Sequence, residues 1–119
     1  MSEVILVGIN PSGKPFRKNC SLDKMNVWME ALGFHHYSFS NVIPYEGEYK
    51  MKDVDLNFVR SFVNGYRKVI ALGGFASQAL KRAGVEHYTL PHPSPLNRKL
   101  NDREYENNCL KECKEWLRT

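Results

Sequence analysis

Glu3-Val4-Ile5-Leu6-Val7-Gly8 is the segment from which the fold class follows, because a run of apolar residues is ended there by a glycine. A short, continuous run of β-branched and aliphatic residues indicates a strand buried on both faces, as in a parallel sheet. The residues from Gly8 to Asn19 are rich in glycine, proline and polar side chains, which is typical of a loop. The first expected element is therefore a buried parallel strand that leads into a long loop.

Strands and helices are predicted to alternate along the rest of the chain. The expected strands span residues 3–7, 37–43, 68–72 and 85–90, and the expected helices span residues 21–32, 53–64, 75–83 and 102–117. Such alternation implies a parallel sheet with helices on both faces. Right-handed crossovers leave few strand orders open, and we expect the order 2-1-3-4. The predicted fold class is α/β, a three-layer α/β/α domain around a four-stranded parallel sheet.

Capping residues set the expected helix starts. Ser21 and Asp53 are expected to cap the first two helices, and Asn101 or Asp102 the last. The apolar residues expected on the inner side of the second helix are Val54, Phe58, Val59 and Phe62. Each helix would thus present one apolar face to the sheet.

Length and composition indicate one globular domain that spans residues 1–119. Hydrophobic residues make up 42% and charged residues 25% of the chain, which is ordinary for a soluble protein. No apolar run has the length that a bilayer requires, and residues 1–3 lack the order of a secretion signal. We therefore expect a cytoplasmic monomer without membrane contact.

The cysteines and the net charge bear on cofactors and partners. There are three cysteines, an odd number that argues against a closed disulfide framework. Cys109 and Cys113 have no histidine nearby and form a poor zinc site, so we expect no metal and no cofactor. The net charge of +4 would help the protein approach DNA, because lysine and arginine release counterions from phosphates.

The first loop that can carry chemistry reads Gly8-Ile9-Asn10-Pro11-Ser12-Gly13-Lys14-Pro15-Phe16. The amide of Asn10 follows the strand directly and can hold a water or a ligand atom. A Walker-type phosphate loop fits poorly, because Gly13-Lys14 is followed by Pro15 instead of serine or threonine. Taken alone, the segment is better explained as an ordinary strand-to-helix turn.

The second loop reads Leu90-Pro91-His92-Pro93-Ser94-Pro95-Leu96-Asn97-Arg98-Lys99. His92 can donate a hydrogen bond to a developing negative charge, and three prolines would hold it rigidly. Leu96 suits a wedge that enters a base stack beside phosphate-binding Arg98 and Lys99. The alternative is a proline-rich connector with a packing histidine.

Both loops together resemble the signature motifs of the uracil-DNA glycosylase superfamily. Gly8–Pro11 (GINP) resembles the first motif of the mismatch-specific and the single-strand-selective monofunctional uracil glycosylases. His92–Asn97 (HPSPLN) resembles the second motif of the main and the single-strand-selective enzymes. Ser40–Pro44 (SNVIP) is similar to the family's substrate-recognition strand, and Val69–Gly74 (VIALGG) to its third core strand. The resemblance covers nearly the whole chain in the right order and marks it as a short member.

The resemblance implies a role for individual residues. Asn10 would position the attacking water, and His92 would hydrogen-bond O2 of the departing uracil. Asn41 would read the edge of the flipped base, and Phe16 could stack on it. The residues implied to complete the base pocket are Gly8, Ile9 and Pro11, and those implied to bind DNA are Ser94, Pro95, Leu96, Asn97, Arg98 and Lys99. Because asparagine cannot act as a base, an enzyme with Asn10 should be slower than one with aspartate there.

The predicted function is cleavage of the N-glycosidic bond of uracil, or of a related modified pyrimidine, flipped out of single- or double-stranded DNA. Two alternatives stay open: a catalytically weak module of the same fold that binds a base or DNA, and an N-glycosidase or deoxyribosyltransferase acting on free nucleosides or nucleotides. The last would expect a carboxylate nucleophile, and neither motif loop contains aspartate or glutamate.

Overall fold

The fold was obtained as a computed structural model that describes residues 3–11, 20–94 and 97–119. Its strands are β1 (Val4–Gly8), β2 (Ser38–Asn41), β3 (Lys68–Leu72) and β4 (Tyr88–Leu90). They form one sheet in the order β2-β1-β3-β4, and all three neighbouring pairs are parallel. The predicted strand order is confirmed.

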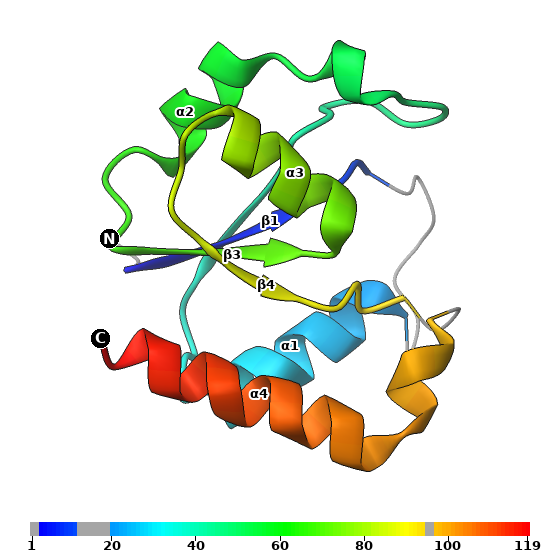
Figure 1. The fold of residues 1–119 in the computed structure, drawn as a ribbon, viewed down its shortest axis with the longest axis vertical. Helices are drawn as coiled ribbons and strands as arrows, with labels where there is room; N and C mark the ends of the chain where they lie inside the picture. The colour runs from blue at the N-terminus through cyan, green and yellow to red at the C-terminus, as the bar shows by residue number, and fades with distance from the viewer. Residues whose placement is uncertain (1–2, 12–19, 95–96) are drawn as a thin grey trace.

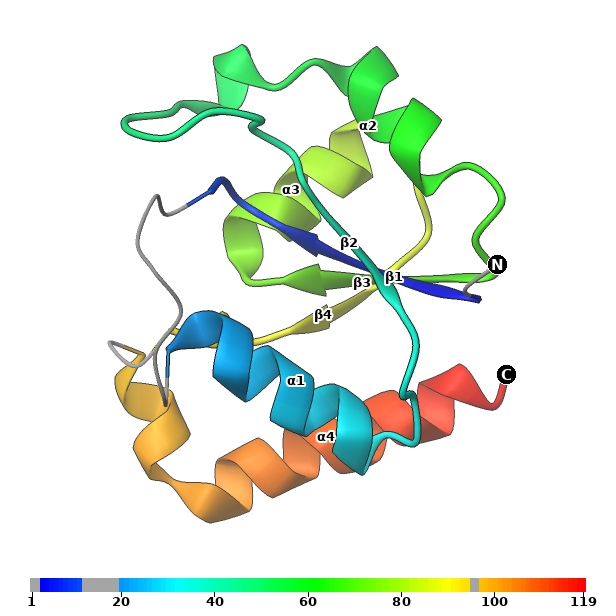
Figure 2. The same ribbon diagram turned by 180° about the vertical axis from the view of Figure 1, so that it is seen from behind.

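Four α-helices and two short 3-10 helices connect the strands. These are α1 (Ser21–Ala31), η1 (Met51–Asp53), α2 (Leu56–Val63), α3 (Gly74–Arg82), η2 (Arg98–Asn101) and α4 (Arg103–Leu117). The helices α2 and α3 cover one face of the sheet, and α1 and α4 cover the other (Figures 1 and 2). The predicted three-layer α/β/α architecture is therefore confirmed.

Strand β1 is one of the two inner strands of the sheet, and both of its faces are covered. All five of its residues are buried, and its side chains alternate between two cores. Ile5 and Val7 pack in the core beneath α2 and α3, whereas Val4 and Leu6 pack in the core beneath α1 and α4. A strand in this position has no polar face, which explains the continuous apolar run in the sequence.

Two of the strands are shorter in the structure than the sequence predicts. Strand β2 ends at Asn41, although the backbone N–H groups of Val42 and Ile43 still donate to the carbonyl oxygens of Gly8 and Ile9 over 3.1 and 2.8 Å. Strand β4 begins at Tyr88 instead of residue 85. The apolar character of Val85 reflects packing against the core beneath α2 and α3, not strand pairing.

The predicted start of α2 was also wrong. Its cap is Asp55, whose carboxylate accepts hydrogen bonds from the backbone N–H groups of Asn57 and Phe58. Asp53 instead ends the preceding 3-10 helix. Of the residues predicted on the inner side, Phe58 is 37% exposed, whereas Val59 is buried and Val54 and Phe62 pack against the core; Val63 is the other buried residue of this helix.

The parallel order brings four loops to one edge of the molecule. All strands point the same way, so that the segments after their carboxyl ends lie together, while the start of β1 and the C-terminus lie near the opposite edge (Figure 1). In sheets of this type ligands bind beyond the carboxyl ends of the strands. Within the part of the chain that the structure describes, no helix has the length and apolar character that a membrane crossing requires.

Candidate active site

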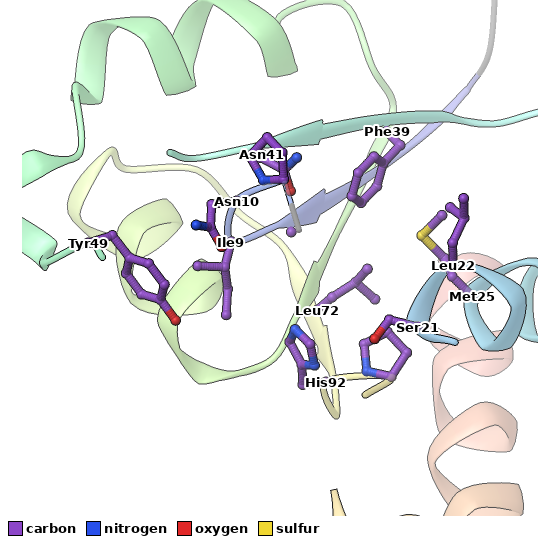
Figure 3. Close-up of a pocket in the computed structure, with 13 residues that line it drawn as sticks. Ile9, Asn10, Ser21, Leu22, Met25, Phe39, Asn41, Tyr49, Leu72 and His92 are labelled. Atoms are coloured by element: carbon purple, nitrogen blue, oxygen red, sulfur yellow. The ribbon is translucent and has the colours of Figure 1, made fainter. Parts of the chain in front are cut away.

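A cavity of about 420 Å³ opens at the carboxyl edge of the sheet (Figure 3). That volume lies within the usual range for sites that bind small ligands. Six residues predicted from the sequence line it: Gly8, Ile9, Asn10, Pro11, Asn41 and His92. Both loops and the β2 strand therefore contribute to one cavity.

Seven further wall residues were not predicted as site residues: Ser21, Leu22, Met25, Phe39, Tyr49, Leu72 and Pro93. The position of Phe39 could have been predicted from the sequence, because Phe39 stands two residues before Asn41 on the same strand and so shares its face. Tyr49 lies in an irregular segment, so no helix or strand periodicity in the sequence indicates that it lines the cavity.

The remaining predicted site residues lie outside this wall. Phe16, Pro95 and Leu96 fall outside the described residues. Arg98 and Lys99 are exposed in η2, and Ser94 and Asn97 are half-buried in the loop between β4 and η2. The described residues that were predicted to bind DNA therefore lie close to His92 in sequence, in the segment that follows it.

The absence of a side chain at Gly8 makes room for two others. A Cβ built on Gly8 would lie 2.7 Å from Oδ1 of Asn41 and 3.0 Å from Cζ of Phe39. Gly8 pairs with Asn41 across the sheet, and both Asn41 and Phe39 lie over its backbone. Glycine is thus required at this strand end so that an amide and an aromatic ring can share one wall of the cavity.

Asn10 is oriented by hydrogen bonds to a neighbouring loop. Its Nδ2 donates to the carbonyl oxygens of Tyr45 and Gly47 over 3.3 and 3.1 Å. An amide nitrogen carries two hydrogens, and both have a partner here. The carbonyl oxygen Oδ1 of Asn10 is left to accept a hydrogen bond from a water or a ligand in the cavity.

The protonation state of His92 follows from its surroundings. Its Nδ1 accepts a hydrogen bond from the backbone N–H of Ser94 over 3.1 Å, so the ring hydrogen is on Nε2 in the neutral form. Burial lowers the pKa of His92 below its ordinary value. At neutral pH the cavity therefore has an uncharged imidazole with an Nε2–H donor.

Two neighbours hold His92 in place. A Cβ on Gly73 would lie 3.1 Å from Cβ of His92, and Gly73 has a left-handed φ of 92°. On the other side, Nδ2 of Asn97 donates to the carbonyl oxygen of His92 over 3.0 Å, while its Oδ1 accepts from the N–H of Lys99. Asn97, predicted to bind DNA, thus uses its amide to fix the loop.

The cavity wall is uncharged among the described residues. None of them is aspartate, glutamate, lysine or arginine, and His92 is neutral for the reason given above. The described part of the chain contains no group of three metal-ligating side chains that could hold an ion. What the wall offers is amide groups, an imidazole donor, the hydroxyl groups of Ser21 and Tyr49, and apolar surface.

No protein-family model matches this sequence, and no curated protein matches it either. The likeness to uracil-DNA glycosylases therefore depends on the motifs and on the cavity that they line.

Proposed function

We propose that the protein is a monofunctional DNA glycosylase of the uracil-DNA glycosylase type, acting on uracil or a related pyrimidine flipped out of DNA. The observation that carries the proposal is one uncharged cavity in which Asn10, Asn41 and His92 stand together. These are a water-orienting acceptor, an edge-reading amide and a donor for the departing base. Asn10 follows β1, Asn41 ends β2 and His92 follows β4, so these residues are far apart in the sequence.

The reaction proposed is hydrolysis. Water attacks C1′ of the deoxyribose, the C1′–N1 bond breaks, and its electron pair leaves with the base, whose negative charge is shared with O2. The Nε2–H of His92 stabilises that charge without transferring a proton, and the proton of the water passes to solvent. One preorganised donor of this kind contributes on the order of 3 kcal/mol. Oδ1 of Asn10 accepts a hydrogen bond from the attacking water and fixes its position.

Phe39 takes the stacking role that the sequence prediction gave to Phe16. Its ring lines the cavity beside Asn41 (Figure 3), and 44% of the residue is exposed. A half-exposed ring next to an edge-reading amide is suited to stack on a flipped base, because every base has an apolar face. Leu22 and Met25 of α1 provide apolar surface on another part of the wall.

The reading as an N-glycosidase for free nucleosides is less well supported. Enzymes that form a covalent glycosyl intermediate need a carboxylate nucleophile, and no described wall residue is acidic. Arg98 and Lys99, exposed beside the His92 loop, are better matched to the phosphates of a polymer.

The test is a strand-scission assay on oligonucleotides that hold one uracil, in single strands and in duplexes. Alkali-induced scission at the uracil, with free uracil as the other product, is the expected result. His92→Ala should lower turnover about a hundredfold while binding persists.

Three outcomes would count against the proposal. Salt-sensitive binding without scission would favour the binding module. Release of base from free deoxynucleotides alone would favour the nucleotide enzyme. Equal turnover of wild type and His92→Ala would remove His92 from the mechanism.

A further inference from the structure

The amide of Asn10 connects two parts of the chain that are about three tenths of its length apart in sequence. Through Nδ2 it contacts the carbonyl oxygens of Tyr45 and Gly47, which lie 35 and 37 residues further on. Because both hydrogens of the Asn10 amide are donated toward this segment, its carbonyl oxygen must point to the opposite side. Which way the Asn10 side chain faces is therefore set by the turn at residues 45–47.

This turn is held at both ends. Before it, the N–H of Ile43 donates to the carbonyl oxygen of Ile9 over 2.8 Å. After it, the N–H of Lys50 donates to the carboxylate of Asp53 over 2.8 Å, and the ring of Tyr49 packs edge-on against Phe75 with centroids 4.7 Å apart. The two carbonyl groups that receive Asn10 are thus part of an anchored segment.

Gly47 gives the turn its shape. Its φ of +96° lies in the left-handed region, which residues with a Cβ rarely adopt. A Cβ added there would have no atom within 4 Å, so space does not exclude alanine. Any effect of Gly47→Ala must therefore come from the backbone conformation, and with it from the direction of the carbonyl groups.

We propose that the turn Tyr45–Gly47 is a positioning element for Asn10 and that Gly47 is its positioning residue. That Oδ1 of Asn10 orients the attacking water rests on the proposed function. The turn does not touch the reacting atoms; it acts through the orientation of the Asn10 amide. Asparagine at position 10 is then required for its donors as much as for its oxygen.

This reverses the expectation for an aspartate at position 10. A carboxylate keeps the oxygen that faces the cavity, but its second oxygen would stand against the carbonyl oxygens of Tyr45 and Gly47 instead of donating to them. Oxygen lone pairs that face each other repel, and the contact loses both of its hydrogen bonds. Asn10→Asp should therefore lower kcat instead of raising it.

The first experiment compares Gly47→Ala with Gly65→Ala. Gly65 has nearly the same φ, +91°, and an equally empty surrounding, but it lies between α2 and β3, away from the cavity wall. Both variants should lose similar thermal stability. We expect Gly47→Ala alone to lower kcat about tenfold with little change in KM, since a misplaced catalytic group is costly. Gly47→Asn should restore most of the rate, because asparagine tolerates the left-handed region.

The second experiment follows the side-chain NH2 of Asn10 by NMR, and it needs no substrate. In the wild type and in Gly65→Ala these hydrogens should exchange slowly with water, and in Gly47→Ala they should exchange as fast as in a free amide. If no oligonucleotide is cleaved but this pattern is found, the proposed function fails and the positioning element stands. Fast exchange in the wild type, equal kcat in the two alanine variants, or a faster Asn10→Asp enzyme would each overturn the inference.

Discussion

Gly8 is the position at which one missing atom shapes the cavity wall. The space that its Cβ would take is occupied by the amide of Asn41 and the ring of Phe39. Its backbone conformation is not left-handed, so the requirement for glycine here is one of space alone. The sequence predicted Gly8 from its motif, but the reason for it became visible only with Phe39 in place.

Gly8→Ala should therefore impair binding more than folding. The new methyl group must displace Asn41 and Phe39, and we expect KM for a uracil oligonucleotide to rise about tenfold, with an overpacking cost of about 1–2 kcal/mol in unfolding free energy. Steady-state kinetics and urea denaturation measure the two effects.

Gly74→Ala is the matched control for this substitution. A Cβ on Gly74 meets no atom within 4 Å, and the residue begins α3, where alanine is favourable. If Gly74→Ala raised KM as much as Gly8→Ala, the close contact at Gly8 would not be the cause.

The residues of the candidate site were predictable where a motif carried them. Asn10 and His92 follow strands in recognisable motifs, and the structure places both on one cavity. The place of Tyr49 in the wall and the hydrogen bonds that orient Asn10 were not predictable, because both depend on how an irregular loop folds back over β1. Tertiary hydrogen bonds of that kind leave no period in the sequence.

The position of helix α1 in front of the cavity depends on a tie to α4. The carboxylate of Glu106 accepts hydrogen bonds from Nε1 of Trp28 over 2.6 Å and from Nζ of Lys24 over 2.9 Å. Burial acts to raise the pKa of Glu106, but the two hydrogen bonds and the charge of Lys24 outweigh it, so the pKa is lowered overall. The ionised carboxylate thus belongs to the folded state and links the two helices on this face of the sheet.

Glu106→Gln should destabilise the protein by about 1 kcal/mol at pH 7, because a partly exposed ion pair is replaced by neutral contacts. A group whose pKa is lowered by folding stabilises above its unfolded value of about 4.5, and this contribution is lost as the pH falls through the folded value. The difference between wild type and variant should therefore shrink below about pH 4.5 in urea denaturation.

Glu115→Gln provides the control on the same helix. Glu115 is exposed and makes no ion pair with any other residue in the described ranges. Its replacement should leave stability nearly unchanged at every pH. A gap between Glu106→Gln and wild type that persisted at pH 3 would contradict the role given to the carboxylate.

The elements themselves were largely predictable, and their ends were not. The strand order and the layers follow from apolar runs that alternate with helical patterns, and both are confirmed. The start of α2 was misplaced because Asp53 and Asp55 are equally good caps in sequence, and only the packing of Val59 and Val63 selects Asp55. The sequence pattern of residues 85–87 is compatible with a strand, but the pairing of β4 with β3 begins only at Tyr88.

Over the whole molecule, the net charge of +4 predicts association with DNA that depends on salt. Arg98 and Lys99 are exposed beside the His92 loop. If each binds one phosphate, the double variant Arg98→Ala/Lys99→Ala should reduce the slope of log Kd against log salt by about 2. Fluorescence anisotropy with a labelled oligonucleotide measures this slope.

The double variant Lys111→Ala/Lys114→Ala removes the same charge from exposed positions of α4. It should weaken binding slightly through the overall field, with a nearly unchanged slope. Equal slopes for the two double variants would show that the charge acts only through its sum and that no phosphate is bound at η2.

The uncharged wall of the cavity has a consequence for chemical selectivity. An ionised ring substituent, such as a carboxylate on C5 of a pyrimidine, would give up its hydration on entry and meet no counter-ion among the described wall residues. Loss of hydration without compensation costs several kcal/mol. Neutral lesions should accordingly be excised, and anionic ones should be left in the DNA.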